Sequence, residues 1–93
     1  MNRDNYLIYK ILEFSKNNYI PGRPSVSVKI DGYDEGAIRE HLRLMEAEGL
    51  LEKIVPGYGM DVIVKNSNQI KGLTPEGEER YIELHETYGI TTN

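Results

Sequence analysis

A single glycine separates a helical pattern from an apolar, strand-like run, and leaves no room for a loop. Residues 34–48 carry apolar side chains three and four positions apart, Gly49 follows, and Leu50-Leu51 begins the next apolar run. Glycine is favoured just past a helix C-terminus because it adopts a left-handed backbone without strain. The junction predicts that a helix opening at Asp34 turns sharply into a strand over Leu50–Val55, so both elements must share one core.

Two further helices are predicted, one at each end of the chain. Asp4 or Asn5 caps a helix that reaches about Asn17, and Thr74-Pro75-Glu76 combines a cap, a first-turn proline and a first-turn acid. Gly89 ends this last helix. The apolar stripe of the helix from Asp34 is expected to comprise Ile38, His41, Leu42 and Met45.

Short strands are predicted between the helices. Polar and β-branched residues alternate over Ser25–Ile30, and tight glycine turns favour antiparallel pairing. Further strands are expected over Leu50–Val55 and Met60–Val64, joined by a turn at Pro56–Gly59, with a short extra pairing at Gln69–Lys71. The order helix, strand, helix, strand, strand, helix predicts an α+β fold with three helices, a small antiparallel sheet and a β-hairpin.

The composition excludes several classes of protein. A chain of 93 residues holds one core, so residues 1–93 are expected to form a single domain. The absence of cysteine excludes disulfides and thiolate metal sites, and the sequence shows no membrane span or signal peptide, so a cytoplasmic protein is expected. His41 and His85 lack a third ligand at metal-binding spacing, and no catalytic constellation stands out. We therefore expect no enzyme activity, no cofactor and no bound metal.

The net charge of −4 belongs to the C-terminal segment. From Thr74 onward the chain holds five glutamates against one arginine, whereas residues 1–73 hold ten acidic and ten basic residues. Nucleic-acid-binding domains usually carry a basic footprint, and this chain has none in bulk. A local basic patch remains compatible with this balance, because the electrostatic field follows the positions of charges.

Two segments resemble winged helix-turn-helix proteins. Ile38–Leu51 resembles their recognition helix and its glycine turn into the wing, and Leu73–Gly77 resembles the start of the helix after the wing in MarR-like and PadR-like regulators. Most of the chain is similar to a family of small winged-helix proteins from bacteria and their prophages, to which no activity is assigned. The likeness covers Arg3–Leu12, Ile30–Leu50 and Leu73–Gly77. The resemblance to the regulators implies a winged helix that binds DNA, as a transcriptional regulator or an accessory protein of a phage or mobile element.

The sequence departs from these regulators before the second helix. A complete helix-turn-helix has a positioning helix there, but Ser25–Gly32 is strand-like and carries no helical stripe. The helix-turn-helix is therefore incomplete, which leaves docking on DNA by the usual geometry open. The alternative is a protein-interaction module on the same scaffold, without catalysis.

Five residues are candidates for contact with DNA. Arg39 and Arg43 lie on the exposed face of the second helix, and Lys53, Tyr58 and Lys65 surround the predicted hairpin. Arginine can pair with phosphate or with a guanine edge. The alternative for the helix is a solvated face stabilised by Glu–Arg pairs, and the hairpin glycines can serve turn geometry alone.

Four of the seven tyrosines lie on the terminal helices. Tyr6, Tyr9, Tyr81 and Tyr88 are candidates for a homodimer interface, because tyrosine combines an apolar ring with a polar tip. The alternative is that they complete the core of a single chain.

Overall fold

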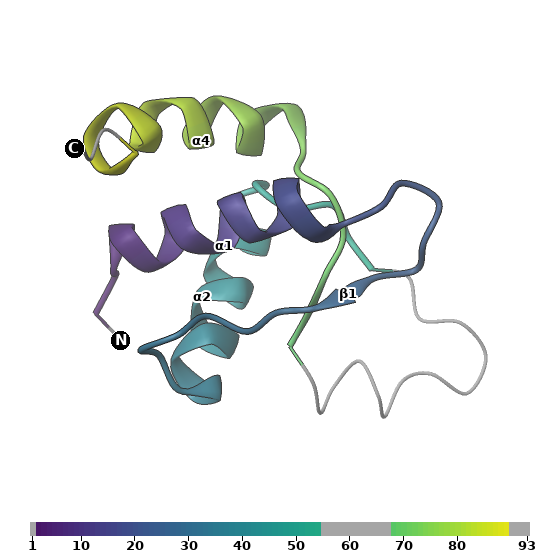
Figure 1. Ribbon diagram of the computed structural model, residues 1–93, viewed down its shortest axis with the longest axis horizontal. Coiled ribbons are helices and arrows are strands. Elements are labelled where there is room, and N and C mark those ends of the chain that lie inside the picture. The colour runs from purple at the N-terminus through teal and green to yellow at the C-terminus, as the bar shows by residue number, and fades with distance from the viewer. Residues whose placement is uncertain (1, 55–67, 90–93) are drawn as a thin grey trace.

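Helix α1 (Asn5–Asn18) lies between the two other helices (Figure 1). Helix α4 (Pro75–Tyr88) packs on one side of it and helix α2 (Glu35–Ala47) on the other. The computed structural model of the chain describes residues 2–54 and 68–89. In these residues the fold is α+β, with three helices and a two-stranded antiparallel sheet, as predicted at this coarse level.

Helix α1 forms where the sequence predicts it. Its N-cap is Asp4, whose side chain accepts a hydrogen bond of 3.0 Å from the main-chain N–H of Leu7. The helix ends at Tyr19, which has extended backbone angles. Its apolar residues fall at helical spacing and form the centre of the core, with Leu7, Ile8, Ile11 and Leu12 fully buried.

Helix α2 begins and ends at the predicted residues. The Asp34 side chain caps it by accepting from the Ala37 N–H at 2.7 Å, and Gly49 follows with a φ of 77°. The N–H of Leu50 then donates to the carbonyl of Met45 at 2.9 Å, which closes the C-terminal turn. Ile38, His41 and Met45 are buried as predicted. Leu42 is only half-buried, because it lies at the side of the helix that faces a groove.

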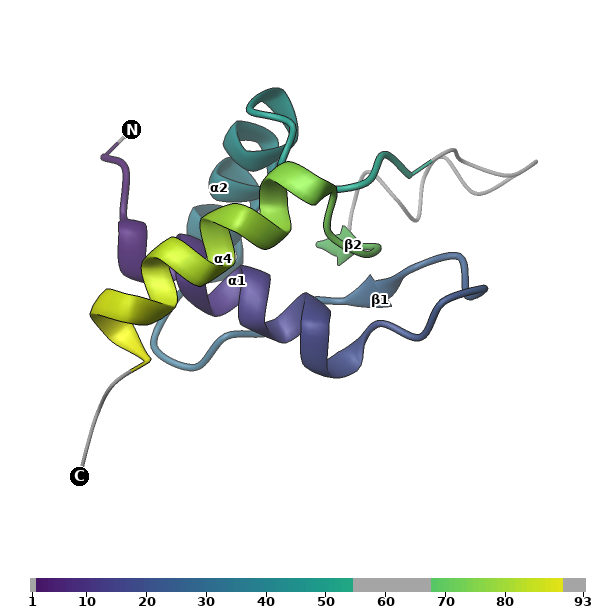
Figure 2. The same cartoon turned by 90° about the horizontal axis from the view of Figure 1, so that it is seen from above.

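The sheet is shorter than predicted. Strand β1 (Val26–Ser27) pairs antiparallel with strand β2 (Gln69–Ile70), with Val26 opposite Ile70 (Figure 2). One further hydrogen bond joins the Val28 N–H to the Asn68 carbonyl at 2.7 Å. The predicted strand over 25–30 and the predicted pairing at 69–71 are thus confirmed only in part.

The predicted strand over 50–55 is not formed in the described residues 50–54. Leu51 makes a single antiparallel bridge to Leu73, and the Glu52 N–H donates to the Gly72 carbonyl at 3.0 Å. Towards Leu50 the pairing ends because α4 begins at Pro75. Val55, the turn at Pro56–Gly59 and the strand predicted over 60–64 lie outside the described residues.

Helix α4 starts at the predicted cap and proline. The Thr74 hydroxyl accepts from the Gly77 N–H at 3.0 Å and donates to the carbonyl of Gly49, so the cap also joins α4 to the end of α2. Across the described residues, none of the helices has the length and apolar character needed to cross a membrane.

Candidate functional site

The exposed face of α2 is oriented by a histidine on its buried face. His41 Nε2 accepts a hydrogen bond of 3.0 Å from the main-chain N–H of Asp4, and its Nδ1 lies 2.8 Å from the carbonyl oxygen of Ala37. Because Nε2 accepts, the ring carries its proton on Nδ1 and donates it to Ala37. These bonds fix the rotation of α2 against the start of α1, so the opposite face of α2 points to solvent.

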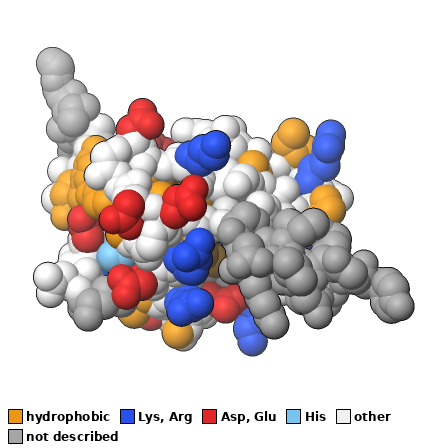
Figure 3. Space-filling model, turned by 90° about the horizontal axis from the view of Figure 1, so that it is seen from below, with side chains coloured by type: hydrophobic (Ala, Val, Ile, Leu, Met, Phe, Trp, Pro, Cys, Tyr) orange, Lys and Arg blue, Asp and Glu red, His pale blue; other side chains and the backbone are white. Residues whose placement is uncertain are grey.

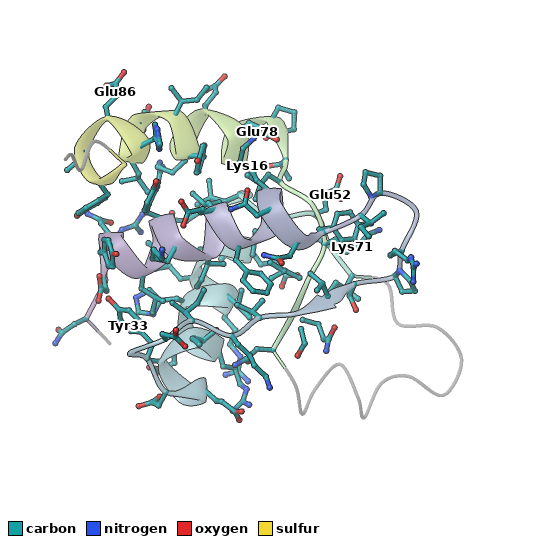
Figure 4. The ribbon with its side chains drawn as sticks, in the orientation of Figure 1. Lys16, Tyr33, Glu52, Lys71, Glu78 and Glu86 are labelled. Atoms are coloured by element: carbon teal, nitrogen blue, oxygen red, sulfur yellow. The ribbon has the colours of Figure 1, made fainter. Side chains whose placement is uncertain are left out.

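Asp4 joins a third segment to this contact. The Tyr33 hydroxyl, just before α2, donates to Asp4 Oδ2 at 2.9 Å, and Figure 4 shows Tyr33 near the start of α1. The Leu7 N–H and the Tyr33 hydroxyl favour the ionised carboxylate and lower the pKa of Asp4. Burial, followed by the hydrogen bond to Asp4, raises the pKa of Tyr33. The start of α2 is therefore held to α1 by two adjacent polar contacts.

Glu48, the C-cap of α2, holds the other end of the helix. Its carboxylate pairs with Arg3 ahead of α1 and with Arg80 of α4, the latter at 3.6 Å. The hydrogen bond from Arg3 is the main reason why the pKa of Glu48 is lowered. One carboxylate thus connects all three helices.

Arg39 and Arg43 lie one helical turn apart on the outer side of α2. Arg39 is half-buried and Arg43 is exposed. Neither arginine makes an ion pair or a hydrogen bond with residues 2–54 or 68–89. Four cations are neutralised within the chain: Arg3 and Arg80 by Glu48, Lys10 by Glu13, and Lys16 by Glu78 between α1 and α4 (Figure 4). Among the described residues, Arg23, Lys29, Lys53 and Lys71 form no ion pair either. Within residues 2–54 and 68–89, no acidic side chain therefore neutralises the two guanidinium groups of α2.

Acidic side chains lie among these arginines. Glu40 follows Arg39 directly and is exposed, and Glu46 lies three positions beyond Arg43. Figure 3 shows basic and acidic side chains next to one another on the side of the molecule that α2 occupies at the bottom of Figure 1. The face is mixed in charge, and the predicted arginines do not form an uninterrupted basic stripe.

A groove of about 560 Å³ separates α2 from the segments at the sheet. The α2 wall consists of Arg39, Leu42, Arg43 and Glu46, and the opposite wall includes Leu51, Glu52, Ile54 and Asn68. This volume lies within the range of small-molecule sites. The groove therefore brings Arg39 and Arg43 next to an apolar surface.

Three further residues, Lys53, Tyr58 and Lys65, are predicted to contact DNA. Lys53 is exposed near the end of the first described segment, whereas Tyr58 and Lys65 lie outside the described residues. Within residues 2–54 and 68–89, no three His, Asp or Glu side chains come together in a group that could hold a metal ion.

The predicted dimer tyrosines pack against one another between α1 and α4. The rings of Tyr9 and Tyr81 are stacked with centroids 5.6 Å apart, and Tyr6 meets Tyr88 edge-on at 5.3 Å. The Tyr9 hydroxyl also lies 2.9 Å from His85 Nδ1. Tyr9 is 3 % exposed and contributes to the core, whereas Tyr6 is 43 % exposed. The cluster therefore stabilises the chain itself. Its outer edge, formed by Tyr6 and the half-buried Tyr88, stays accessible to solvent.

Burial has a large effect on Tyr9. Loss of solvent around the hydroxyl, followed by the nearby charge of Glu13, raises the pKa of Tyr9 to about 12. The hydroxyl is therefore neutral in the folded chain at all physiological pH values.

Sequence reasoning missed Asn68 and the polar contacts of Asp4, Tyr33 and Glu48. The sequence marks Asn68 only as part of a turn, and its burial depends on β1 and α2, which lie far away along the chain.

Comparison with protein families, curated proteins and solved structures finds no match for this chain.

Proposed function

We propose that this chain is a winged-helix DNA-binding protein that contacts duplex DNA through α2. The observation that supports this proposal most is the position of Arg39 and Arg43, one turn apart on the outer side of α2. Neither forms an ion pair within the described residues, whereas Arg3 and Arg80 both pair with Glu48. A transcriptional regulator, or an accessory protein of a phage or mobile element, is the role implied by the sequence resemblance.

The element order supports the winged-helix part of the proposal. Strand β1 follows α1, α2 comes next, and β2 pairs with β1 immediately before α4. The two segments that resemble winged-helix regulators are in direct contact, through Leu51 opposite Leu73 and the Thr74 cap on Gly49. This contact, which joins α2 to α4, supports the winged-helix proposal.

The chemistry of α2 suits a phosphate backbone or a guanine edge. Each guanidinium offers several N–H donors in a planar fork, which matches two oxygens of a phosphate or the O6 and N7 of guanine. Glu40 beside Arg39 disfavours phosphate but can accept from the amino group of cytosine. Discrimination between base pairs is thus built into the same face as the attraction to DNA.

The experiment is a binding titration against a mixed duplex pool at two salt concentrations. Binding by the unaltered chain should weaken steeply with salt, because neutralised phosphates release counterions. Arg39→Ala or Arg43→Ala should cost about 1–3 kcal/mol where the side chain reads a base, or reduce the salt slope by about one where it contacts phosphate. Glu40→Gln should tighten binding because it removes a repulsive charge.

Lys16→Ala is the matched control. It removes the same charge from α1, where Lys16 pairs with Glu78, and should leave the affinity for DNA unchanged. Equal effects of Lys16→Ala and Arg39→Ala would contradict a specific role for α2.

A protein partner is the second candidate function. The observation that favours it is the mixed charge of the α2 face, where Glu40 and Glu46 lie among the arginines. Weak duplex binding that is abolished at physiological salt and unaffected by the three α2 substitutions would replace the DNA proposal with this one.

We also propose that two copies of the chain associate through the outer edge of the tyrosine cluster. Tyr6 presents a large exposed ring there, beside the half-buried Tyr88. A dimer would present two α2 helices to one duplex, as two-fold symmetric DNA-binding proteins do.

A further inference from the structure

The contact between α1 and α2 contains a buried histidine whose hydrogen bonds require the neutral ring. His41 is 4 % exposed, and main-chain groups engage both of its ring nitrogens. Nε2 accepts from the Asp4 N–H, and Nδ1 donates to the Ala37 carbonyl. A main-chain N–H can only donate, so a proton on Nε2 would set two donors against each other across a distance of 3.0 Å. The bond between Asp4 and His41 therefore cannot survive protonation of His41.

Charged and titratable groups approach this contact from all three helices and from the segment before α2. The Asp4 carboxylate interacts electrostatically with His41 and would attract an imidazolium ring. The negative charge of Glu48 is already neutralised by Arg3 and Arg80. The remaining groups are neutral phenols: the Tyr33 hydroxyl, which donates to Asp4, and Tyr6 of α1 and Tyr88 of α4, which interact electrostatically with Tyr33.

The Asp4 carboxylate is not placed to accept a proton from His41 as the contact stands. Its Oδ1 accepts from the Leu7 N–H at 3.0 Å, which caps α1, and its Oδ2 accepts from the Tyr33 hydroxyl at 2.9 Å. Nε2 of His41 is directed instead at the main-chain nitrogen of Asp4. A bond between a protonated Nε2 and the carboxylate would thus require the ring or the carboxylate to move, so protonation rearranges the contact in either case.

We propose that His41 is a pH sensor that couples its own protonation to the position of α2. The neutral ring holds the N-terminal half of α2 to the start of α1, and the protonated ring releases it. Glu48 continues to hold the C-terminal end of α2 through Arg3 and Arg80. The sensor requires no DNA. Its effect on DNA binding rests on the proposed function, because Arg39 precedes His41 by two positions and would move with the released half of the helix.

The sensor acts at a higher pH than the carboxylates of the same contact. The pKa values of Asp4 and Glu48 are lowered from 3.8 and 4.5, so both side chains stay ionised well above those values. A histidine in an unfolded chain takes up its proton near about pH 6.5. Because the folded chain uses the ring as an acceptor, it takes up this proton less readily than the unfolded chain. Stability is therefore complete above about pH 6.5 and is lost as the pH falls through it.

The test follows the whole isotopically labelled chain between about pH 7.5 and about pH 5.5, in the absence of DNA. Amide chemical shifts report on the contact, and chemical denaturation measures stability. We expect the amide signals of Asp4 and of residues 35–41 to move in one titration step, whereas that of Glu48 should move less. The equilibrium constant for unfolding should rise about tenfold across the range, the effect expected for the loss of one buried hydrogen bond.

The two histidines of the chain provide matched variants. Glutamine keeps an acceptor for the Asp4 N–H but takes up no proton in this range, so His41→Gln should remove the titration step. His85 is exposed and contacts Tyr9 from α4, away from the contact between α1 and α2, so His85→Gln should retain the step.

An Asp4 amide signal or an unfolding constant that stays unchanged across the range in the unaltered chain would overturn the proposal, as would a step that persists in His41→Gln. The first reading uses the unaltered chain, so the test does not depend on the folding of a variant at this buried position. None of these results bears on duplex binding at neutral pH, so failure of the sensor is distinguishable from failure of the DNA proposal.

Discussion

Gly77 of α4 lies directly against the carbonyl oxygen of Leu50. A β-carbon added to Gly77 would be 2.0 Å from that oxygen, and Gly77 is the one described residue of α4 that is fully buried. The Thr74 N–H donates to the same Leu50 carbonyl at 3.2 Å. The first turn of α4 is therefore seated on the backbone that leaves α2, and only glycine allows this approach.

We expect Gly77→Ala to destabilise the chain by about 1–3 kcal/mol, because the methyl group must displace backbone at Leu50 or push α4 away. Alanine is the better helix former, so helix propensity alone predicts the opposite sign. Chemical denaturation of the two chains measures the difference. A more stable Gly77→Ala variant would show that α4 is not seated on Leu50.

Gly36→Ala is the control for this prediction. Gly36 lies in the first turn of α2, is exposed, and has only the Asp34 carboxylate within 4 Å of an added β-carbon, at 3.4 Å. Helix propensity should therefore dominate, and the substitution should raise the free energy of unfolding by roughly 0.5–1 kcal/mol.

Acid should weaken the contact between α1 and α2 through Asp4. The folded-state pKa of Asp4 lies below its ordinary value of 3.8, so the folded chain binds this proton less readily than the unfolded chain. The contribution to stability is complete above pH 3.8 and is lost as the pH falls from there through the lowered pKa. Glu48, with a pKa lowered from 4.5, loses its contribution in the same direction. Denaturation curves between neutral pH and acid measure the loss.

The variant Asp4→Asn isolates this effect. Asparagine still caps a helix, so the change removes the charge and one acceptor for the Tyr33 hydroxyl, at a cost of about 1 kcal/mol at neutral pH. Its stability should fall less than that of the unaltered chain as the pH drops. Asp31→Asn, at an exposed site before α2, removes the same charge and should retain the full acid dependence. Parallel curves for the unaltered chain and Asp4→Asn would contradict the assignment.

Alkali should act on Tyr9. Its pKa is raised from 10.0 to about 12, so the stability contributed by the neutral hydroxyl is complete below pH 10.0 and is lost as the pH rises towards 12. Tyrosinate absorbance should show late ionisation, to which Tyr33 also contributes because its pKa is raised. Tyr9→Phe should remove most of the latest step, whereas Tyr6→Phe should leave it in place. An unchanged titration of Tyr9→Phe would show that this hydroxyl is not buried.

The helices could be predicted from the sequence because their signals are local. Asp4, Asp34 and Thr74 cap the helices that they were predicted to cap, and Gly49 ends α2 with a positive φ. Such caps depend on residues within one turn of the helix end. The strands were harder to predict, because their length depends on a partner elsewhere: β1 stops after Ser27, although Val28 and Ile30 continue its alternation into the core.

The candidate site could be predicted only as a helix face. The spacing of Arg39 and Arg43 predicts that both lie on the exposed face of α2; in the structure Arg43 is exposed and Arg39 is half-buried. Whether a charge is neutralised depends on distant residues: Arg80 meets Glu48 from another helix, which no local pattern indicates. The burial of Asn68 is likewise a tertiary property, since it depends on what β1 and α2 bring to residue 68.

The chain should self-associate through the outer edge of the tyrosine cluster. Sedimentation at micromolar concentration should show a species near twice the chain mass of 10.7 kDa. Tyr6→Glu should dissociate it without unfolding the chain, because the Tyr6 ring is 43 % exposed and the substitution places a charge at the outer edge of the cluster. Ile20→Glu is the control, since Ile20 is 59 % exposed but lies beyond the C-terminal end of α1, outside the cluster. A chain that stays monomeric at hundreds of micromolar would limit the four tyrosines to the core of a single chain.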